Sequence, residues 1–178
     1  MPEGRIRRTI RVLLPKKKVT IGKNEIMTIL PHRGTMLLLD EAVISREVIR
    51  GQLLIGDEFC IGHAVFDGRL VFRGVDVPEM AAQLLGVSWA HQHPEFQNRI
   101  GFLGEIKGAK FHEPIIPGEL LIVEMDPAKI RQKVLGGPEL EKMLITVAAR
   151  DILVRVKKER KATIASVKLA IIPHQGKS

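Results

Sequence analysis

The first candidates for chemistry lie in one stretch, residues 62–83, with the sequence GHAVFDGRLVFRGVDVPEMAAQ. It places His63 in a loop and Glu79 in the first turn of a predicted helix. An imidazole takes up a proton near neutral pH and a carboxyl group can supply one, so the pair could perform acid–base chemistry on one substrate. Each residue alone also has a structural explanation, because a loop histidine is usually structural and a carboxylate is stabilised near a helix N-terminus.

Two neighbouring residues favour the chemical interpretation. Gln83 follows Glu79 by four residues, so it lies on the same helix face and can hydrogen-bond and orient the carboxylate. Polar groups buried on a core helix need such a partner. Gly74 precedes the helix, where a residue without a side chain lets a substrate carbonyl approach the backbone N–H groups. The sequence therefore predicts a base, an acid and an oxyanion donor in one loop–helix unit.

The remaining candidates are weaker. Cys60 is interpreted as a small buried hydrophobic residue. His91 and His93 are two residues apart and would not face each other on a helix, so they do not indicate a metal site. His32 is assigned to a turn, with a place at a pocket rim as the alternative. No phosphate-binding glycine loop is present, and the sequence indicates no cofactor and no metal.

One long helix is predicted over residues 75–91, with Asp76 as its N-cap and Pro94 just beyond its end. Apolar residues occupy most of its circumference, which is typical of a helix buried against a sheet. Its apolar positions recur at i, i+3 and i+4 spacing and are Val77, Met80, Ala81, Leu84 and Leu85.

Most of the other apolar segments have the composition of strands. A short helix over residues 24–30, capped by Asn24, precedes them, and a polar insertion over 131–142 interrupts them. The predicted strands cover residues 36–43, 48–55, 100–111, 120–125, 144–156 and 163–172. About six strands and one long helix predict an α+β fold in which an antiparallel sheet wraps the helix.

Composition limits the class of protein. A chain of 178 residues with 45% hydrophobic residues is typical of one globular domain. The single cysteine, Cys60, excludes a disulfide framework. No stretch has the length of a secretory signal or of the ~20 apolar residues of a membrane span. We therefore expect a cytoplasmic protein without a membrane span.

The net charge of +8 is concentrated at one end of the chain. Residues 1–24 hold eight basic residues and one acidic residue, a net +7, so residues 25–178 carry only +1. We therefore divide the chain into a basic N-terminal arm, 1–24, and a domain, 25–178. The arm could contact nucleic acid, an acidic protein or a membrane surface, or it could simply be solvated. With one Trp and no Tyr for base stacking, a nucleic-acid partner is not favoured.

Three blocks together resemble the 3-hydroxyacyl-acyl-carrier-protein dehydratases of type II fatty-acid synthesis, which have the hotdog fold. The first is ILPHRGTMLLLDEAV at 29–43. The second is DEFCIGH at 57–63, which continues into FRGVDVPEMAAQ at 72–83. The third is GEIKGAKFHEPIIPGELL at 104–121. The blocks occur in the family's order, but Ala64 and Val65 replace its Phe-Pro after the histidine, and Phe72 and Arg73 replace its Met-Pro.

The resemblance implies a role for each candidate. His63 matches the catalytic histidine, Glu79 the catalytic acid and Gln83 the glutamine beside it. Gly74 matches the glycine whose N–H polarises the thioester carbonyl. The implied reaction dehydrates a (3R)-3-hydroxyacyl thioester to a trans-2-enoyl thioester in fatty-acid biosynthesis, with no cofactor.

The resemblance also implies partners. In the family, histidine and acid meet across a dimer interface, so a homodimer is the minimum and a trimer of dimers, a hexamer, is expected. Acyl carrier protein would deliver the substrate on phosphopantetheine, and Arg73 is a candidate contact for the phosphate or the carrier. An apolar tunnel would hold the acyl chain, with Met80, Leu84, Phe102 and Phe111 as candidate lining residues.

Two other functions remain open at the level of sequence. A hotdog acyl-thioesterase would use the same helix end and carboxylate, with water as the nucleophile. A non-catalytic oligomeric protein could bind its partner through the basic arm, residues 1–24. The Gly-His pair at 62–63 favours the dehydratase over the thioesterase, and nothing in residues 25–178 supports the binding role.

Overall fold

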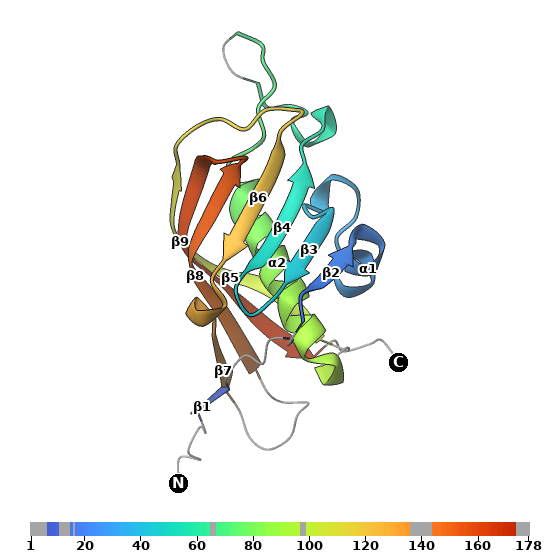
Figure 1. The fold of residues 1–178 in the computed structure, drawn as a ribbon, viewed down its shortest axis with the longest axis vertical. Helices are drawn as coiled ribbons and strands as arrows, with labels where there is room; N and C mark the ends of the chain where they lie inside the picture. Colours follow the sequence, from blue (N-terminus) through green and yellow to red (C-terminus); the bar gives the residue numbers. More distant parts are fainter. Residues whose placement is uncertain are drawn as a thin grey trace.

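A curved antiparallel sheet wraps one long helix, α2, in the computed structural model, which describes residues 7–10, 15, 17–64, 67–96, 99–135 and 144–173 (Figure 1). The helices are α1 (Lys23–Ile29) and α2 (Asp76–Gln92), with short 3-10 turns at Gly34–Met36, Asp57–Phe59, Pro94–Phe96 and Pro127–Lys129. The strands are β1 (Arg7–Ile10), β2 (Val19–Gly22), β3 (Glu41–Ile44), β4 (Ile49–Leu54), β5 (Arg99–Phe111), β6 (Leu120–Met125), β7 (Arg131–Leu135), β8 (Leu144–Val156) and β9 (Glu159–Pro173).

The strand order explains how the sheet encloses the helix. Strands β2, β3, β4, β6, β8, β9 and β5 are neighbours in that order, and β7 also pairs with β8 and carries β1 on its other side. All of these pairs are antiparallel. The predicted α+β hotdog fold is confirmed, and its six main strands are β3, β4, β5, β6, β8 and β9. Within the described part of the chain, β5 pairs only with β9 and forms one edge.

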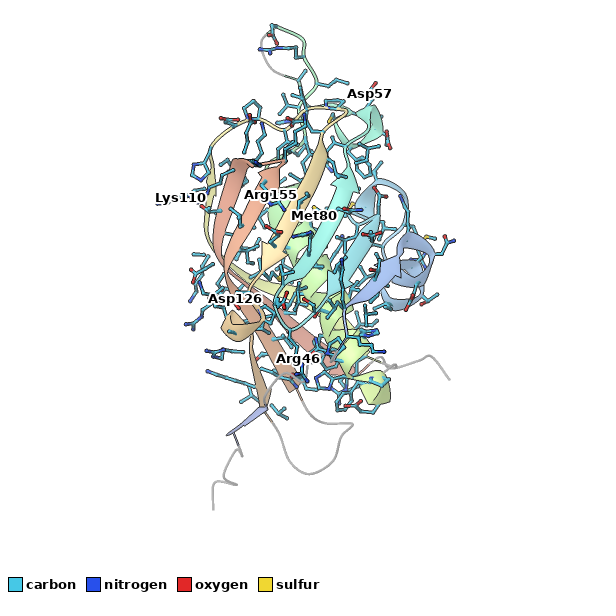
Figure 2. The ribbon with its side chains drawn as sticks, in the orientation of Figure 1. Arg46, Asp57, Met80, Lys110, Asp126 and Arg155 are labelled. Atoms are coloured by element: carbon cyan, nitrogen blue, oxygen red, sulfur yellow. The ribbon has the colours of Figure 1, made fainter. Side chains whose placement is uncertain are left out.

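Helix α2 is buried along most of its length, as its all-round apolar pattern predicts. Met80, Leu84 and Val87 are completely buried, and Met80 lies at the middle of the molecule, where α2 packs on the sheet (Figure 2). The helix contacts β3, β4, β5, β8 and β9. Pro78 is tolerated in the first turn because its missing N–H has no helical partner there.

Both predicted side-chain caps are wrong. Gly22 is the N-cap of α1 and makes no side-chain cap bond, because β2 runs directly into the helix and leaves no position for an Asn24 cap. Val75 is the N-cap of α2, so Asp76 is the first helical residue. The Asp76 N–H donates to the Arg73 carbonyl at 3.0 Å, which forms a turn before the helix. The Asp76 carboxylate accepts a hydrogen bond from Arg73 Nε at 2.7 Å and therefore does not cap the helix.

Other boundaries differ at the edges of the sheet. Within the predicted basic arm, residues 7–10 and 19–22 form β1 and β2, which pair with β7 and β3. The predicted polar insertion begins with β7, and its continuation from residue 136 lies outside the described residues. No helix in the described part of the chain is long and apolar enough to cross a membrane.

A glycine on β4 allows α2 to approach the sheet closely. A Cβ atom at Gly51 would lie 2.6 Å from Leu39 Cδ2 and 3.2 Å from Leu84 Cδ1. Carbon atoms in contact are normally about 3.5–4.0 Å apart, so any side chain at this position would push the helix or the loop outward. Gly51 therefore sets the distance between α2 and the centre of the sheet.

We expect Gly51→Ala to lower the free energy of unfolding by about 1–3 kcal/mol, the usual effect of overpacking a core. Urea denaturation followed by circular dichroism measures the change. Gly104→Ala on β5 is the matched control, since its new Cβ would meet no atom closer than 3.6 Å. Equal stability of the two variants would contradict this role for Gly51.

Candidate functional site

The first turn of α2 presents Glu79 at the end of a cavity. The Glu79 side chain is about one quarter exposed (24%), and Gln83 Nε2 donates a hydrogen bond to its Oε1 at 3.1 Å. This bond joins residues one helical turn apart, as the i, i+4 spacing predicts. Glu79 and Gln83 therefore form one polar pair on an otherwise apolar helix.

Gln83 is itself held by the backbone of a neighbouring loop. It is 2% exposed, its Oε1 accepts the Leu38 N–H at 2.9 Å, and its Nε2 donates to the Met36 carbonyl at 2.8 Å. With the bond to Glu79, the amide uses both its acceptor and its donor group. The orientation of the Glu79 carboxylate is therefore linked to the chain segment before β3.

The same carboxylate has a second partner, His32. His32 Nε2 lies 3.3 Å from Glu79 Oε1. Arg33 stabilises the turn that carries His32, because its guanidinium donates to the carbonyls of Met27 at 2.8 Å and Leu30 at 2.7 Å. His32 lies in a turn at the cavity, as predicted, but its contact with Glu79 does not follow from the sequence. No spacing signal could have indicated this contact, since 47 residues separate the two.

His63 lies on the loop that follows the 3-10 turn Asp57–Phe59, and it is exposed. Its backbone N–H donates to the Cys60 carbonyl at 3.0 Å, and its carbonyl accepts the Val71 N–H at 3.1 Å. Its Nδ1 is 2.9 Å from the Val71 carbonyl. Because a carbonyl oxygen only accepts, Nδ1 carries the hydrogen and the neutral ring keeps the lone pair of Nε2. The loop thus leaves Nε2 of His63 free of any partner among the described residues.

His63 and Glu79 are not joined within one chain. Among the described residues, the hydrogen-bond and ion-pair partners of the Glu79 carboxylate are Gln83 and His32. Among the same residues, the His63 side chain has one hydrogen-bond partner, the Val71 carbonyl. A site that uses both residues on one substrate therefore needs a further arrangement of chains.

Gly74 lies in the turn before α2. Its N–H donates no hydrogen bond to any described residue, while its carbonyl accepts the Val77 N–H at 3.2 Å. A Cβ atom at this position would lie 3.4 Å from the ring of Phe111, so the approach to the backbone is narrow. Arg73 is bonded to Asp76 at the start of the helix and remains partly exposed. An unpaired N–H near a helix start can stabilise an oxyanion.

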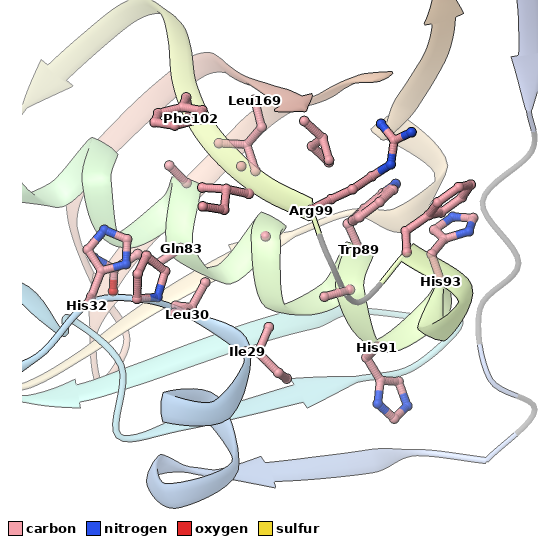
Figure 3. A pocket seen from close by; sticks show the side chains of 18 of the residues that line it. Ile29, Leu30, His32, Gln83, Trp89, His91, His93, Arg99, Phe102 and Leu169 are labelled. Carbon is pink, nitrogen blue, oxygen red and sulfur yellow. The ribbon is translucent and has the colours of Figure 1, made fainter. Parts of the chain in front are cut away.

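A cavity of about 720 Å³ runs along one face of α2 (Figure 3). His32, Glu79 and Gln83 lie at one end, and Trp89, His93 and Arg99 lie toward the other end of the helix. Of the four residues predicted for an acyl tunnel, Phe102 lines this cavity. Met80 and Leu84 belong to the buried core, and Phe111 packs beside Gly74.

The cavity side of α2 has a pattern that the sequence analysis missed. Ala82, Gly86 and Ala90 line the cavity at intervals of four residues and leave room beside the helix. This small-residue row was visible in the sequence as an interruption of the large apolar positions. The helix thus packs with its large residues and forms the cavity with its small ones.

Of the weaker candidates, Cys60 is completely buried, as predicted. Burial together with the nearby Asp57 and Glu58 raises the pKa of the Cys60 thiol, so it is a poor nucleophile. His93 Nδ1 contacts Glu95 Oε1 at 3.1 Å. In the described residues, no group of three or more His, Cys, Asp or Glu side chains could hold a metal ion.

Comparison with solved structures supports the fold. The dehydratase heterocomplex ApeI:P from Xenorhabdus doucetiae matches with a TM-score of 0.52 and 17% identity, over 83% of this chain and 90% of that chain. Cj0977, a sigma28-regulated virulence protein from Campylobacter jejuni, matches with a TM-score of 0.50 and 13% identity, over 86% and 89%. At these identities the likeness shows the fold alone.

Comparison with curated proteins goes further, although no family model matches the chain. The 3-hydroxyacyl-[acyl-carrier-protein] dehydratase FabZ of Enterococcus faecalis is 35% identical over 130 residues, which are 71% of this chain and 89% of the relative. FabZ of Ligilactobacillus salivarius is 39% identical over 114 residues, 62% and 79% of the two chains. The chain therefore belongs to the FabZ family of 3-hydroxyacyl-[acyl-carrier-protein] dehydratases.

Proposed function

We propose that this protein dehydrates (3R)-3-hydroxyacyl thioesters, presented by an acyl carrier protein, to trans-2-enoyl thioesters. The observation that carries the proposal is the Glu79 carboxylate, held by Gln83 at the end of an elongated cavity in a chain of the FabZ family. The cavity provides space for an acyl chain, and the carboxyl group lies where the reacting end of that chain would stop.

The proposed chemistry divides an elimination between two side chains. His63 Nε2 takes the proton from C2, and the electrons of that C–H bond form the C2–C3 double bond. The C3–O bond breaks, and the hydroxyl leaves as water with a proton from Glu79. Within the described residues both contacts of Glu79 go to Oε1, so Oε2 is the atom left to meet the hydroxyl. The Gly74 N–H stabilises the enolate character of the thioester oxygen.

A second copy of the chain completes the site. Strand β5 is a 13-residue edge that pairs only with β9 among the described strands. It exposes the apolar side chains of Phe102, Leu103, Ile106 and Phe111. A long apolar edge strand of this kind favours pairing with another chain. Two-fold pairing through β5 would bring the loop of His63 in one subunit toward the α2 start in the other.

We expect His63→Ala and Glu79→Gln each to lower hydration of a crotonyl thioester by about a hundredfold or more, because each removes one proton-transfer group. The assay follows loss of enoyl absorbance, and size-exclusion chromatography checks that the oligomer persists. His112→Ala and Glu47→Gln are matched controls on exposed positions away from the cavity. Near wild-type turnover by either site variant would refute the assignment, and thiol release without hydration would indicate a thioesterase.

Mixing the two inactive variants tests the shared site. In a dimer with one His63→Ala and one Glu79→Gln subunit, one site loses both groups and the other keeps both. After random reassortment we expect about a quarter of the wild-type activity, since half of the dimers carry one intact site of two. Recovery is measured after unfolding and refolding the mixture, with each variant refolded alone as the control. No recovery would show that both residues act within one chain.

A further inference from the structure

The end of the cavity far from Glu79 is polar. Trp89 is 6% exposed, and its Nε1 is buried without a hydrogen-bond partner. His93 Nε2 is also buried and unpartnered. Both residues line the cavity, as does Arg99. A hydrocarbon chain needs none of these groups, so this end is not explained by holding an alkyl chain alone.

Ring packing fixes these side chains relative to one another. The rings of Trp89 and Phe96 are stacked with centroids 5.7 Å apart, and the Trp89 and His93 centroids are 5.0 Å apart. The Arg99 guanidinium carbon lies 5.0 Å from the Phe96 centroid, a cation–π distance. In Figure 3 the indole nitrogen of Trp89 points toward the Arg99 side chain. The four residues therefore form one preorganised cluster at the end of α2.

The chemistry of the cluster calls for oxygen. An indole N–H only donates, and a buried donor without an acceptor costs about 1–3 kcal/mol. Arg99 brings a guanidinium, which also only donates, and burial lowers its pKa while leaving it charged. His93 Nδ1 faces the Glu95 carboxylate and so carries its hydrogen, which leaves Nε2 of the neutral ring able to accept. An oxygen group placed in this cluster would accept the Trp89 N–H, which is buried without an acceptor, and would lie beside the positive charge of Arg99.

The distance along the helix sets the length of the chain that reaches this cluster. Ten residues separate Glu79 from Trp89, or about 15 Å along the helix axis. An extended alkyl chain advances about 1.3 Å per bond at a C–C length of ~1.5 Å. A distance of about 15 Å corresponds to about eleven or twelve such bonds, so a chain of about twelve carbons spans from the acid to the cluster, past Ala82 and Gly86, which leave space beside the helix.

We propose that the cluster of Trp89, His93, Phe96 and Arg99 binds an oxygen group at the far end of a medium-length acyl chain. The substrates of this protein are then acyl thioesters that carry a hydroxyl or carboxylate at the end opposite the thioester. This inference rests on the proposed dehydratase function, since it names the substrate class of the same cavity.

Trp89 provides a direct binding readout because it is the only tryptophan in the chain. The full-length protein is titrated with saturated N-acetylcysteamine thioesters of dodecanoic acid, 12-hydroxydodecanoic acid and dodecanedioic acid, which cannot be dehydrated. We expect the two oxygenated probes to change Trp89 emission and to bind about fivefold or more tightly than the dodecanoyl probe. Comparing hydroxyl with carboxylate distinguishes the two sources of oxygen, and equal affinity for all three probes overturns the inference.

Two variants test the residues. Arg99→Gln should reduce the advantage of the carboxylate probe at least fivefold, while Arg160→Gln, which removes the same charge at the exposed β8–β9 hairpin, should keep it. Trp89→Phe keeps an aromatic ring but removes the N–H. The preference of this variant for a 3,12-dihydroxydodecanoyl over a 3-hydroxydodecanoyl thioester, as a ratio of kcat/KM, should fall toward one. An unchanged preference in both variants contradicts the assignment of the cluster.

The outcomes separate this inference from the function on which it rests. If His63→Ala abolishes dehydration but the oxygenated probes show no advantage, the dehydratase proposal stands and the inference fails. If the oxygenated probes bind more tightly but no 3-hydroxyacyl thioester is dehydrated, the binding cluster stands and the reaction fails. The wild-type fluorescence titration gives a result even where a variant does not fold.

Discussion

The hydrogen bonds of the Gln83 amide connect the core of this protein to its site. One buried side chain binds the backbone at Met36 and Leu38 and the carboxylate of Glu79. A buried amide is tolerated only when its groups are paired, and here two partners belong to the backbone before β3 and the third is the carboxylate of Glu79. Any shift of α2 along its axis would break the two bonds to Met36 and Leu38, so the position of Glu79 follows from the packing of the helix.

The position of Glu79 is fixed because one side of α2 packs on the sheet while the other side lines the cavity. Leu84 packs under Gly51 at the centre of the sheet, where the absence of a side chain lets the helix approach. On the side of the cavity, Ala82 and Gly86 leave space instead of filling it. Large residues anchor the helix and small residues open the cavity, so the acid, the cavity and its polar far end are all fixed by one rigid element.

The sequence predicts the elements with strong periodicity and fails where distant segments meet. Helix α2 and the main strands follow from spacing and from turn residues, because these signals are local. The prediction of a side-chain cap at Asn24 is wrong because β2 enters α1 directly. The prediction at Asp76 is wrong because Arg73 binds its carboxylate. His32 could not be assigned to Glu79, since only the folded chain brings its turn to the helix. Tertiary contacts, invisible in spacing, decide these positions.

Glu79 and His63 lie on separate elements of the chain. Glu79 and the cavity lie along α2, so in the proposed reaction the length and polarity of the acyl chain would be measured along the helix that carries the acid. The base belongs to a separate loop, and its tautomer depends on one bond from His63 to the Val71 carbonyl. The segment that connects His63 to the helix differs from the family pattern at Ala64, Val65, Phe72 and Arg73. The cavity, in contrast, is lined by α2 together with β5 and the turn of His32, so in the proposed function a change in that segment would alter the base without altering the space for the acyl chain.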